Sequence, residues 1–161
     1  MGELVDRGLA AWHHVLRQRD PEVMSAALDE VLAEDVVFHS PVVHTPQQGR
    51  AVTKLYLMAA ANVLPGQAKA DSGGSAGAGS SKPAGVPDRA FRYVREVRGE
   101  RDAVLEFVTE VDGITINGVD MIRWNDAGRI EDFKVMIRPL KAIQKVHAGM
   151  AAMLEAMKPR G

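Results

Sequence analysis

Before residue 65, apolar residues recur at intervals of three and four, which is the spacing of amphipathic helices. The stripe of a first helix is formed by Val5, Leu9, Trp12 and Leu16. Asp20, Pro21 and Glu22 follow in the order of a helix start: an N-cap, a proline and an acid. The second helix is expected to place on one face Met24, Leu28, Val31 and Leu32. A third helix is predicted from about 50 to 63.

The pattern changes to strands after residue 88. Strands are predicted at 91–97, 104–111, 114–124 and 130–137, and the short turns between them indicate an antiparallel meander. A β-rich run at 36–40 adds a short strand that Pro41 ends. Asn117-Gly118 is a turn signal inside a strand, which allows a bulge or break there. A last helix begins at Pro139, so the fold class is α+β, with helices packed on one face of a curved sheet.

The segment 65–88 consists mainly of Gly, Ala, Ser and Pro, and it has a single branched apolar residue, Val86. Such a composition cannot bury itself and is typical of a flexible linker. The parts before and after it are each too short for a comfortable core of their own. We therefore predict one domain over 1–161 with a flexible insertion at 65–88, drifting in solvent rather than closing over a pocket.

Composition and charge narrow the possible partners. The chain has 161 residues, 46% hydrophobic and 25% charged, which is typical of one globular domain. With 20 basic and 21 acidic residues the net charge is −1, so the basic excess that drives binding to nucleic acid or anionic membranes is missing. There is no cysteine and no apolar run long enough to span a membrane. We expect a cytoplasmic protein with neither nucleic acid nor membrane as partner.

Alternation along the strand at 114–124 separates its two faces. Ile116, Asp120, Ile122 and Trp124 share one face, and Val119 and Met121 lie on the other. Both faces are therefore partly apolar. Because one layer of helices covers a single face, we expect a second subunit on the other, in a homodimer formed through the sheet.

Asp120 is the main candidate for chemistry. An ionised carboxylate in the middle of an apolar strand face is costly unless it is paired or opens to a cavity. One interpretation is a carboxyl in an apolar pocket, with its pKa raised so that it can give or take a proton near neutral pH. The other is structural: an ion pair with a partner such as Arg92 or Arg123, or a strand edge that is open to solvent.

The histidines and glycines indicate no cofactor. His39 and His44 are five apart across a proline-bounded loop, which matches no metal-ligand spacing, and we expect no metal. His44 remains a candidate for proton transfer at the mouth of a pocket, against the alternative of a solvated loop histidine. The glycines of 65–88 follow no strand and do not have the spacing of a phosphate-binding loop, so no nucleotide cofactor is expected.

The order of elements, together with AEDVVFHSPVVHTPQQGR at 33–50 and GVDMIRWNDAGRIEDF at 118–133, resembles the nuclear transport factor 2-like superfamily and, within it, the SnoaL-like proteins. The resemblance spans nearly the whole chain except the insertion. It implies a cone-shaped, strongly curved antiparallel or mixed sheet in a cystatin-like roll, with an apolar pocket between sheet and helices and commonly a dimer. This scaffold hosts isomerases, cyclases, dehydratases and non-catalytic binders.

The resemblance can be followed residue by residue. Asp120 falls where ketosteroid isomerases place the protonated aspartate of their oxyanion hole, a carboxylic acid that its apolar surroundings keep neutral. Their general base corresponds to Ser40, and their oxyanion-hole tyrosine corresponds to Trp12. The steroid isomerase mechanism is therefore disfavoured. SnoaL-like polyketide cyclases require less: a single acid/base aspartate near this position and a substrate that supplies its own acidic carbon.

These arguments lead to a pocket protein for a small, largely apolar, carbonyl-bearing molecule. Asp120 would be the acid/base group of a cyclase, isomerase or dehydratase, with Ser40 or His44 orienting the substrate. The predicted wall consists of Trp12, Phe38, Tyr56, Phe107, Ile122, Trp124 and Phe133, although a filled core is the alternative for most of these residues. The competing hypotheses are a non-catalytic ligand-binding module and a protein-interaction domain of the same fold.

Overall fold

The computed structural model describes residues 2–64 and 90–158. The predicted insertion at 65–88 lies outside the described residues. The elements follow in the order α1 (Glu3–Leu16), α2 (Pro21–Val31), β1 (Leu32–His39), β2 (Gln47–Gln48), α3 (Arg50–Val63), β3 (Arg92–Arg98), β4 (Asp102–Val111), β5 (Ile114–Trp124), β6 (Ile130–Arg138) and α4 (Leu140–Ala156).

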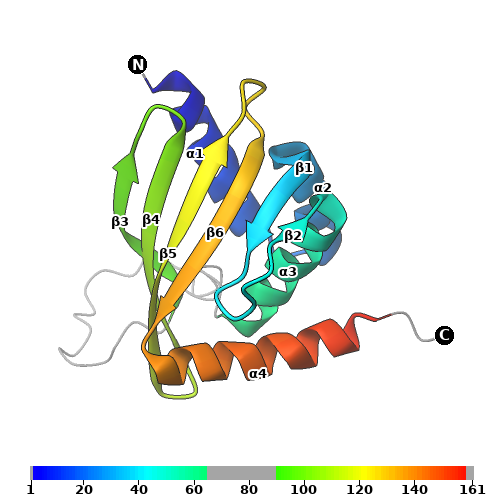
Figure 1. The fold of residues 1–161 in the computed structure, drawn as a ribbon, viewed down its shortest axis with the longest axis vertical. Helices are drawn as coiled ribbons and strands as arrows, with labels where there is room; N and C mark the ends of the chain where they lie inside the picture. The colour runs from blue at the N-terminus through cyan, green and yellow to red at the C-terminus, as the bar shows by residue number, and fades with distance from the viewer. Residues whose placement is uncertain (1, 65–89, 159–161) are drawn as a thin grey trace, which may run out of the picture.

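The strands form one curved, mixed sheet with the order β2-β1-β6-β5-β4-β3 (Figure 1). The meander from β3 to β6 is antiparallel, as predicted, and β1 pairs with β6 in parallel. Helices α1, α2 and α3 lie on one side of the sheet, and α4 crosses its lower end in this view (Figure 1). The α+β fold class is confirmed.

A local sequence signal explains where α2 begins. Asp20 caps α2, with its Oδ1 accepting hydrogen bonds from the amides of Glu22 at 2.8 Å and Val23 at 3.2 Å. The helix ends at Val31, so Leu32 does not continue its apolar face but begins β1, four residues earlier than predicted. Pairing with β6 supplies the backbone partners that extend this strand backward.

The bulge or break that the sequence allows at Asn117-Gly118 is not present. Strand β5 pairs with β4 without a register shift from Ile114 to Arg123, with Gly118 opposite Phe107. A Cβ at position 118 would lie 2.5 Å from the Phe107 ring and 2.5 Å from the carbonyl oxygen of Met136. The glycine therefore serves close packing at this point of the sheet and not a turn.

The core consists of two hydrophobic clusters on the helix-covered face of the sheet. The first joins α1, α2 and β1 to the part of β5 that carries Ile122 and Trp124. The second joins α3 and α4 to Phe107 and Ile116. On β5, Asp120 lies between Ile116 of one cluster and Ile122 of the other, and this boundary is where the candidate site is found.

Candidate functional site

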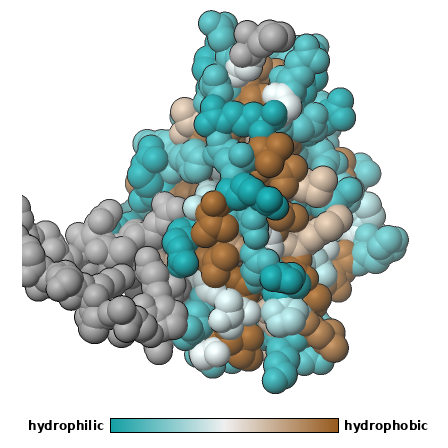
Figure 2. All heavy atoms as spheres, turned by 90° about the vertical axis from the view of Figure 1, so that its left-hand side faces the viewer, coloured by the Kyte–Doolittle hydropathy of each residue, from teal (hydrophilic) through white to brown (hydrophobic). Residues whose placement is uncertain are grey.

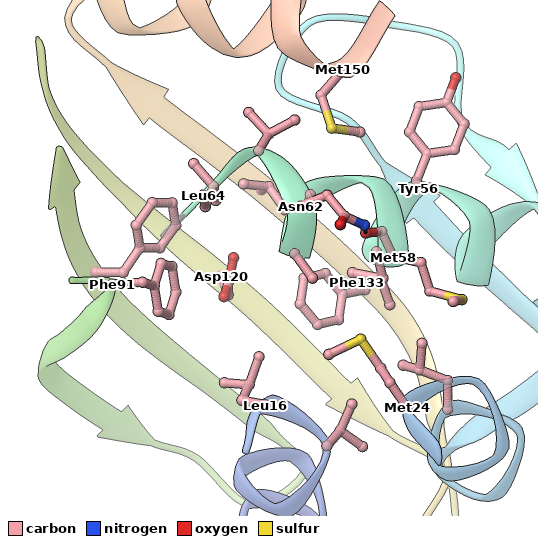
Figure 3. A pocket seen from close by; sticks show the side chains of 18 of the residues that line it. Leu16, Met24, Tyr56, Met58, Asn62, Leu64, Phe91, Asp120, Phe133 and Met150 are labelled. Atoms are coloured by element: carbon pink, nitrogen blue, oxygen red, sulfur yellow. Dashed lines mark hydrogen bonds between the residues drawn. The ribbon is translucent and has the colours of Figure 1, made fainter. Parts of the chain in front are cut away.

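A cavity of about 450 Å³ opens between the sheet and the helices. Its wall takes residues from all four helices and from β1, β3, β4, β5 and β6. Figure 3 shows the labelled side chains arranged around Asp120, with Leu16 on α1, Met24 on α2, Phe91 before β3 and Met150 on α4. The volume is in the range of small-molecule sites, and the wall is mostly apolar.

Asp120 is the acidic residue of this wall and is only 6% exposed. Its Oδ2 accepts a hydrogen bond of 2.5 Å from the hydroxyl of Tyr93. Its Oδ1 accepts none from the described residues, and none of their fully buried side-chain oxygens lacks a partner. Oδ1 is therefore not sealed in the core and can be reached from the cavity.

Tyr93 links Asp120 to the first helix. The indole Nε1 of Trp12 donates a 3.0 Å hydrogen bond to the Tyr93 hydroxyl oxygen, and that hydroxyl donates onward to Asp120. Both side chains also pack edge-on against neighbouring rings: Trp12 against Phe133, with ring centroids 5.0 Å apart, and Tyr93 against Phe91 at 5.2 Å. Packing and hydrogen bonds together fix the direction of the Asp120 carboxyl group.

The electrostatics follow from burial. Loss of hydration raises the pKa of Asp120 from 3.8 to about 7, and the hydrogen bond from Tyr93 opposes this rise. Burial, and next the negative charge of Asp120, hold the pKa of Tyr93 well above its ordinary value, so Tyr93 stays protonated. A carboxyl that titrates near pH 7 can act as either acid or base at physiological pH.

The structure contains no ion pair between Asp120 and either Arg92 or Arg123. Arg123 points to the opposite face of β5, where its Nε lies 3.3 Å from Glu131. Arg92 precedes Tyr93 in β3, so the two side chains alternate and Arg92 points away from the cavity. Burial and the Tyr93 hydrogen bond are the influences that act on this carboxyl.

Most residues proposed for the wall lie on it: Trp12, Phe38, Ser40, Tyr56, Phe107, Asp120 and Phe133. Ser40 follows β1, and its Oγ accepts a 3.2 Å hydrogen bond from the amide of Val42. Its hydroxyl proton is not used in that bond, so Ser40 keeps a donor for another partner.

Three proposed residues lie elsewhere. Ile122 and Trp124 are each 1% exposed and belong to the filled core instead of the cavity wall. The reason is α1, which crosses this end of the sheet so closely that any side chain at Gly8 would overlap the Trp124 ring. His44 is exposed in the loop between β1 and β2 and does not line the cavity.

Sequence reasoning missed Tyr93, which is the direct partner of Asp120. The signal that could have found it is the pair Phe91 and Tyr93, two aromatic residues two positions apart at the start of a strand, because such a pair shares one face. The methionines that complete the wall, Met24, Met58 and Met150, carry no such signal, since their helical stripes are those of ordinary core residues.

Residues 2–64 and 90–158 contain no group of three or more His, Cys, Asp or Glu side chains placed to hold a metal ion. None of the helices formed by these residues is both long enough and apolar enough to cross a membrane.

Comparisons with solved structures show which proteins share this fold. The chain is similar to a steroid delta-isomerase from Pseudomonas aeruginosa, with 29% identity, coverage of 96% of this chain and 93% of that one, and a TM-score of 0.73. It is similar to an uncharacterised cystatin-like-fold protein from Silicibacter pomeroyi, at 26% identity, 94% and 87% coverage and a TM-score of 0.69. A nuclear transport factor 2-like protein from Mesorhizobium loti shares the fold at 18% identity, 86% and 93% coverage and a TM-score of 0.60.

These similarities agree with the resemblance seen in the sequence: the chain has the cystatin-like fold, which it shares with nuclear transport factor 2-like proteins. No protein-family model matches the chain. No curated protein matches it either.

Proposed function

We propose that the cavity binds a small, largely apolar, carbonyl-bearing molecule and that Asp120 exchanges a proton with it. The observation that carries the proposal is a carboxyl, 6% exposed and with one oxygen open to an apolar cavity, whose pKa is raised to about 7. Perturbed carboxyls of this kind concentrate at functional sites. The similarity to a protein called a steroid delta-isomerase supports the same chemical class.

The geometry suggests how the carboxyl would work. Tyr93 donates to Oδ2, so in the neutral acid the proton resides on Oδ1, which faces the ligand. There it can donate a hydrogen bond to a carbonyl oxygen and stabilise the negative charge that develops when the neighbouring carbon loses a proton to solvent. In the ionised form the same oxygen can accept that proton. Ser40 lies on the wall, and its hydroxyl proton, which the bond from Val42 does not use, would orient the ligand.

The wall determines which reactions are compatible. Among its described residues, Asp120 is the only Asp, Glu or His, so the mechanism that uses one carboxyl as base and a second as oxyanion donor has no second carboxyl here. Chemistry with one proton-transfer group remains, such as an aldol-type cyclisation of a substrate with an acidic carbon, or a dehydration. We therefore favour the cyclase type over the steroid isomerase type.

The experiment measures proton exchange without needing the natural substrate. β-Tetralone, an apolar bicyclic ketone with acidic hydrogens beside its carbonyl, is incubated in deuterated buffer, and loss of its proton signals is followed by NMR. The wild-type protein should accelerate exchange, and Asp120→Asn should lower this acceleration by about a hundredfold or more. Asp132→Asn, which changes a carboxyl on the outer face of the sheet, is the matched control and should exchange like wild type. Equal rates for wild type and Asp120→Asn would refute the catalytic role.

The single proton-transfer group also favours a second candidate, a binding module without chemistry. In that case β-naphthol should raise the melting temperature of wild type and of Asp120→Ala alike, and neither protein should accelerate exchange. Stabilisation lost in Asp120→Ala, together with exchange in wild type, would reject this candidate.

We also propose that the outer face of the sheet joins two copies of the chain. Met121 and Met136 on this face are 37% and 53% exposed, and on the edge strand β3 Val94 and Val97 are 48% and 57% exposed. Figure 2 views the molecule from the β3 side, where apolar side chains emerge between polar ones. Light scattering should give a dimer that Met136→Glu dissociates. Leu140→Glu, at a position at the start of α4 that is 69% exposed, should leave the dimer intact, and a monomeric wild type would refute the proposal.

A further inference from the structure

The wall residues that are exposed to solvent show where the cavity opens. Nearly all wall residues are buried or half-buried, and the exposed ones are Arg19, Pro21, Ala61 and Asn62. The first two lie in the connection from α1 to α2 and at the start of α2, and the other two lie in the last turn of α3. A ligand that occupies the cavity therefore meets solvent between this connection and the end of α3.

Arg19 is the charged residue at this mouth. Arg19 and Asp120 are the only Asp, Glu, Lys or Arg residues of the described wall. The cavity therefore has one cation at its opening and one carboxyl inside. In the described part of the chain no acidic side chain forms an ion pair with Arg19. The adjacent Asp20 uses its Oδ1 to cap α2, and Asp29 pairs with Lys54 at 2.8 Å.

A guanidinium group without a protein partner is suited to bind an oxyanion, because it is always charged and presents several donors in one plane. We infer that Arg19 binds an anionic group of the ligand, so that the ligand is amphipathic, with its carbonyl toward Asp120 and a carboxylate, sulfate or phosphate at the mouth. The acidic Glu22, in the first turn of α2, is exposed and is not part of the wall. The inference rests on the proposed function in taking the cavity as the ligand site.

Two fluorescent probes that differ by one charge test the inference. Anilinonaphthalene sulfonate and its uncharged parent, phenylnaphthylamine, both brighten when they leave water for an apolar cavity. Each should displace the other from the wild-type protein. In Arg19→Gln, the Kd of the sulfonate should rise about fivefold, the order of an exposed ion pair, and that of the uncharged probe should not change. Salt should weaken binding of the sulfonate to wild type more than to Arg19→Gln.

Arg17→Gln is the matched control, because Arg17 is exposed two residues away but does not line the cavity. It should leave the ratio of the two Kd values unchanged. The inference is overturned if Arg19→Gln changes both probes equally, if Arg17→Gln changes the ratio as much, or if the sulfonate does not bind where the uncharged probe does. The two proposals can also fail separately. If Arg19→Gln changes the ratio of the two Kd values but Asp120→Asn exchanges the protons of β-tetralone as fast as wild type, the catalytic proposal is refuted and this inference stands.

Discussion

Neighbouring positions on the inner face of β5 follow the same alternation and have opposite outcomes. At one end Ile122 and Trp124 are 1% exposed beneath α1 and fill the space between sheet and helix. Two residues from Ile122, Asp120 faces a cavity of about 450 Å³. The difference lies in the helix above each position, since Gly8 lets α1 approach the Trp124 ring, whereas the helices around Asp120 leave a gap.

The comparison teaches that strand alternation determines which side chains point inward but not whether they form core or wall. A carboxyl beneath α1 would be sealed without water and would carry the full cost of burial. Beside the cavity the same group keeps one oxygen accessible and takes one hydrogen bond from Tyr93. The clusters on either side supply rigidity, and the boundary between them holds the reactive group.

The largest effect is expected from truncation at the filled end. Trp124→Ala should lower the free energy of unfolding by about 3–5 kcal/mol, because it opens a new void in a tightly packed core. Leu57→Ala, on the half-buried wall of the cavity, should cost less than about 2 kcal/mol, because it enlarges a space that already exists. Urea unfolding of both variants measures the difference. Equal losses in the free energy of unfolding would mean that the side chains around the cavity are packed as densely as those around Trp124.

The next effect is a dependence of stability on pH that comes from Asp120. Its pKa is raised in the folded protein from 3.8 to about 7, so between these values the folded state holds a proton that the unfolded state has lost. Stability should therefore fall as the pH rises from about 4 to 7 and should then level off. The total loss is about 4 kcal/mol, from roughly three pKa units at about 1.4 kcal/mol each.

Urea unfolding of wild type and Asp120→Asn across this range isolates the contribution. Asp120→Asn should gain stability relative to wild type with rising pH, because an amide carries no charge to bury. Asp132→Asn, at a carboxyl on the outer face that faces His39 at 2.8 Å, should not reproduce this curve. A constant difference between wild type and Asp120→Asn from pH 4 to 8 would show that the carboxyl is not buried.

Much of the fold could be predicted because local signals and long-range packing agree. The third helix was predicted from about 50 to 63 and is found there, and β5 has the predicted bounds. The two-residue strand β2 at Gln47–Gln48 was missed because two glutamines carry no strand pattern and depend on pairing with β1. Leu32 was misplaced because its apolar spacing continues the helix, whereas the tertiary pairing with β6 begins a strand.

The candidate site was predictable in part. Asp120 could be singled out because a charged residue in an apolar strand face needs an explanation. The pair Phe91 and Tyr93 could have placed Tyr93 on the inner face, but not beside Asp120, because their contact joins β3 to β5 across β4. A register shift between Tyr93 and Arg95 also breaks the alternation along the rest of β3. Ile122 and Trp124 were expected on the wall because the sequence does not show where α1 crosses the sheet.

An intermediate effect is expected where β5 passes beneath Phe107. In Gly118→Ala the added Cβ would meet the Phe107 ring and the backbone carbonyl of Met136, both at 2.5 Å, and the carbonyl is held by the sheet. The free energy of unfolding should fall by about 1–3 kcal/mol. Gly99→Ala is the control, because its Cβ would find its nearest atom, the carbonyl oxygen of Asp102, at 3.4 Å. Equal stability of wild type and Gly118→Ala would show that the two strands can separate there without cost.

The smallest effect is expected from the loss of one hydrogen bond, the one from Tyr93 to Asp120. Tyr93→Phe removes the donor that stabilises ionised Asp120, so the pKa of Asp120 should rise from about 7 by roughly one unit. Carbon-13 NMR titration of the aspartate carboxyls measures the shift, and any exchange activity should follow it to higher pH. Tyr56→Phe is the control, because Tyr56 lines the same cavity with its ring 5.3 Å from Phe38 and forms no described bond to Asp120. A pKa of Asp120 that stays unchanged or falls in Tyr93→Phe would mean that water or ligand, not Tyr93, governs this carboxyl.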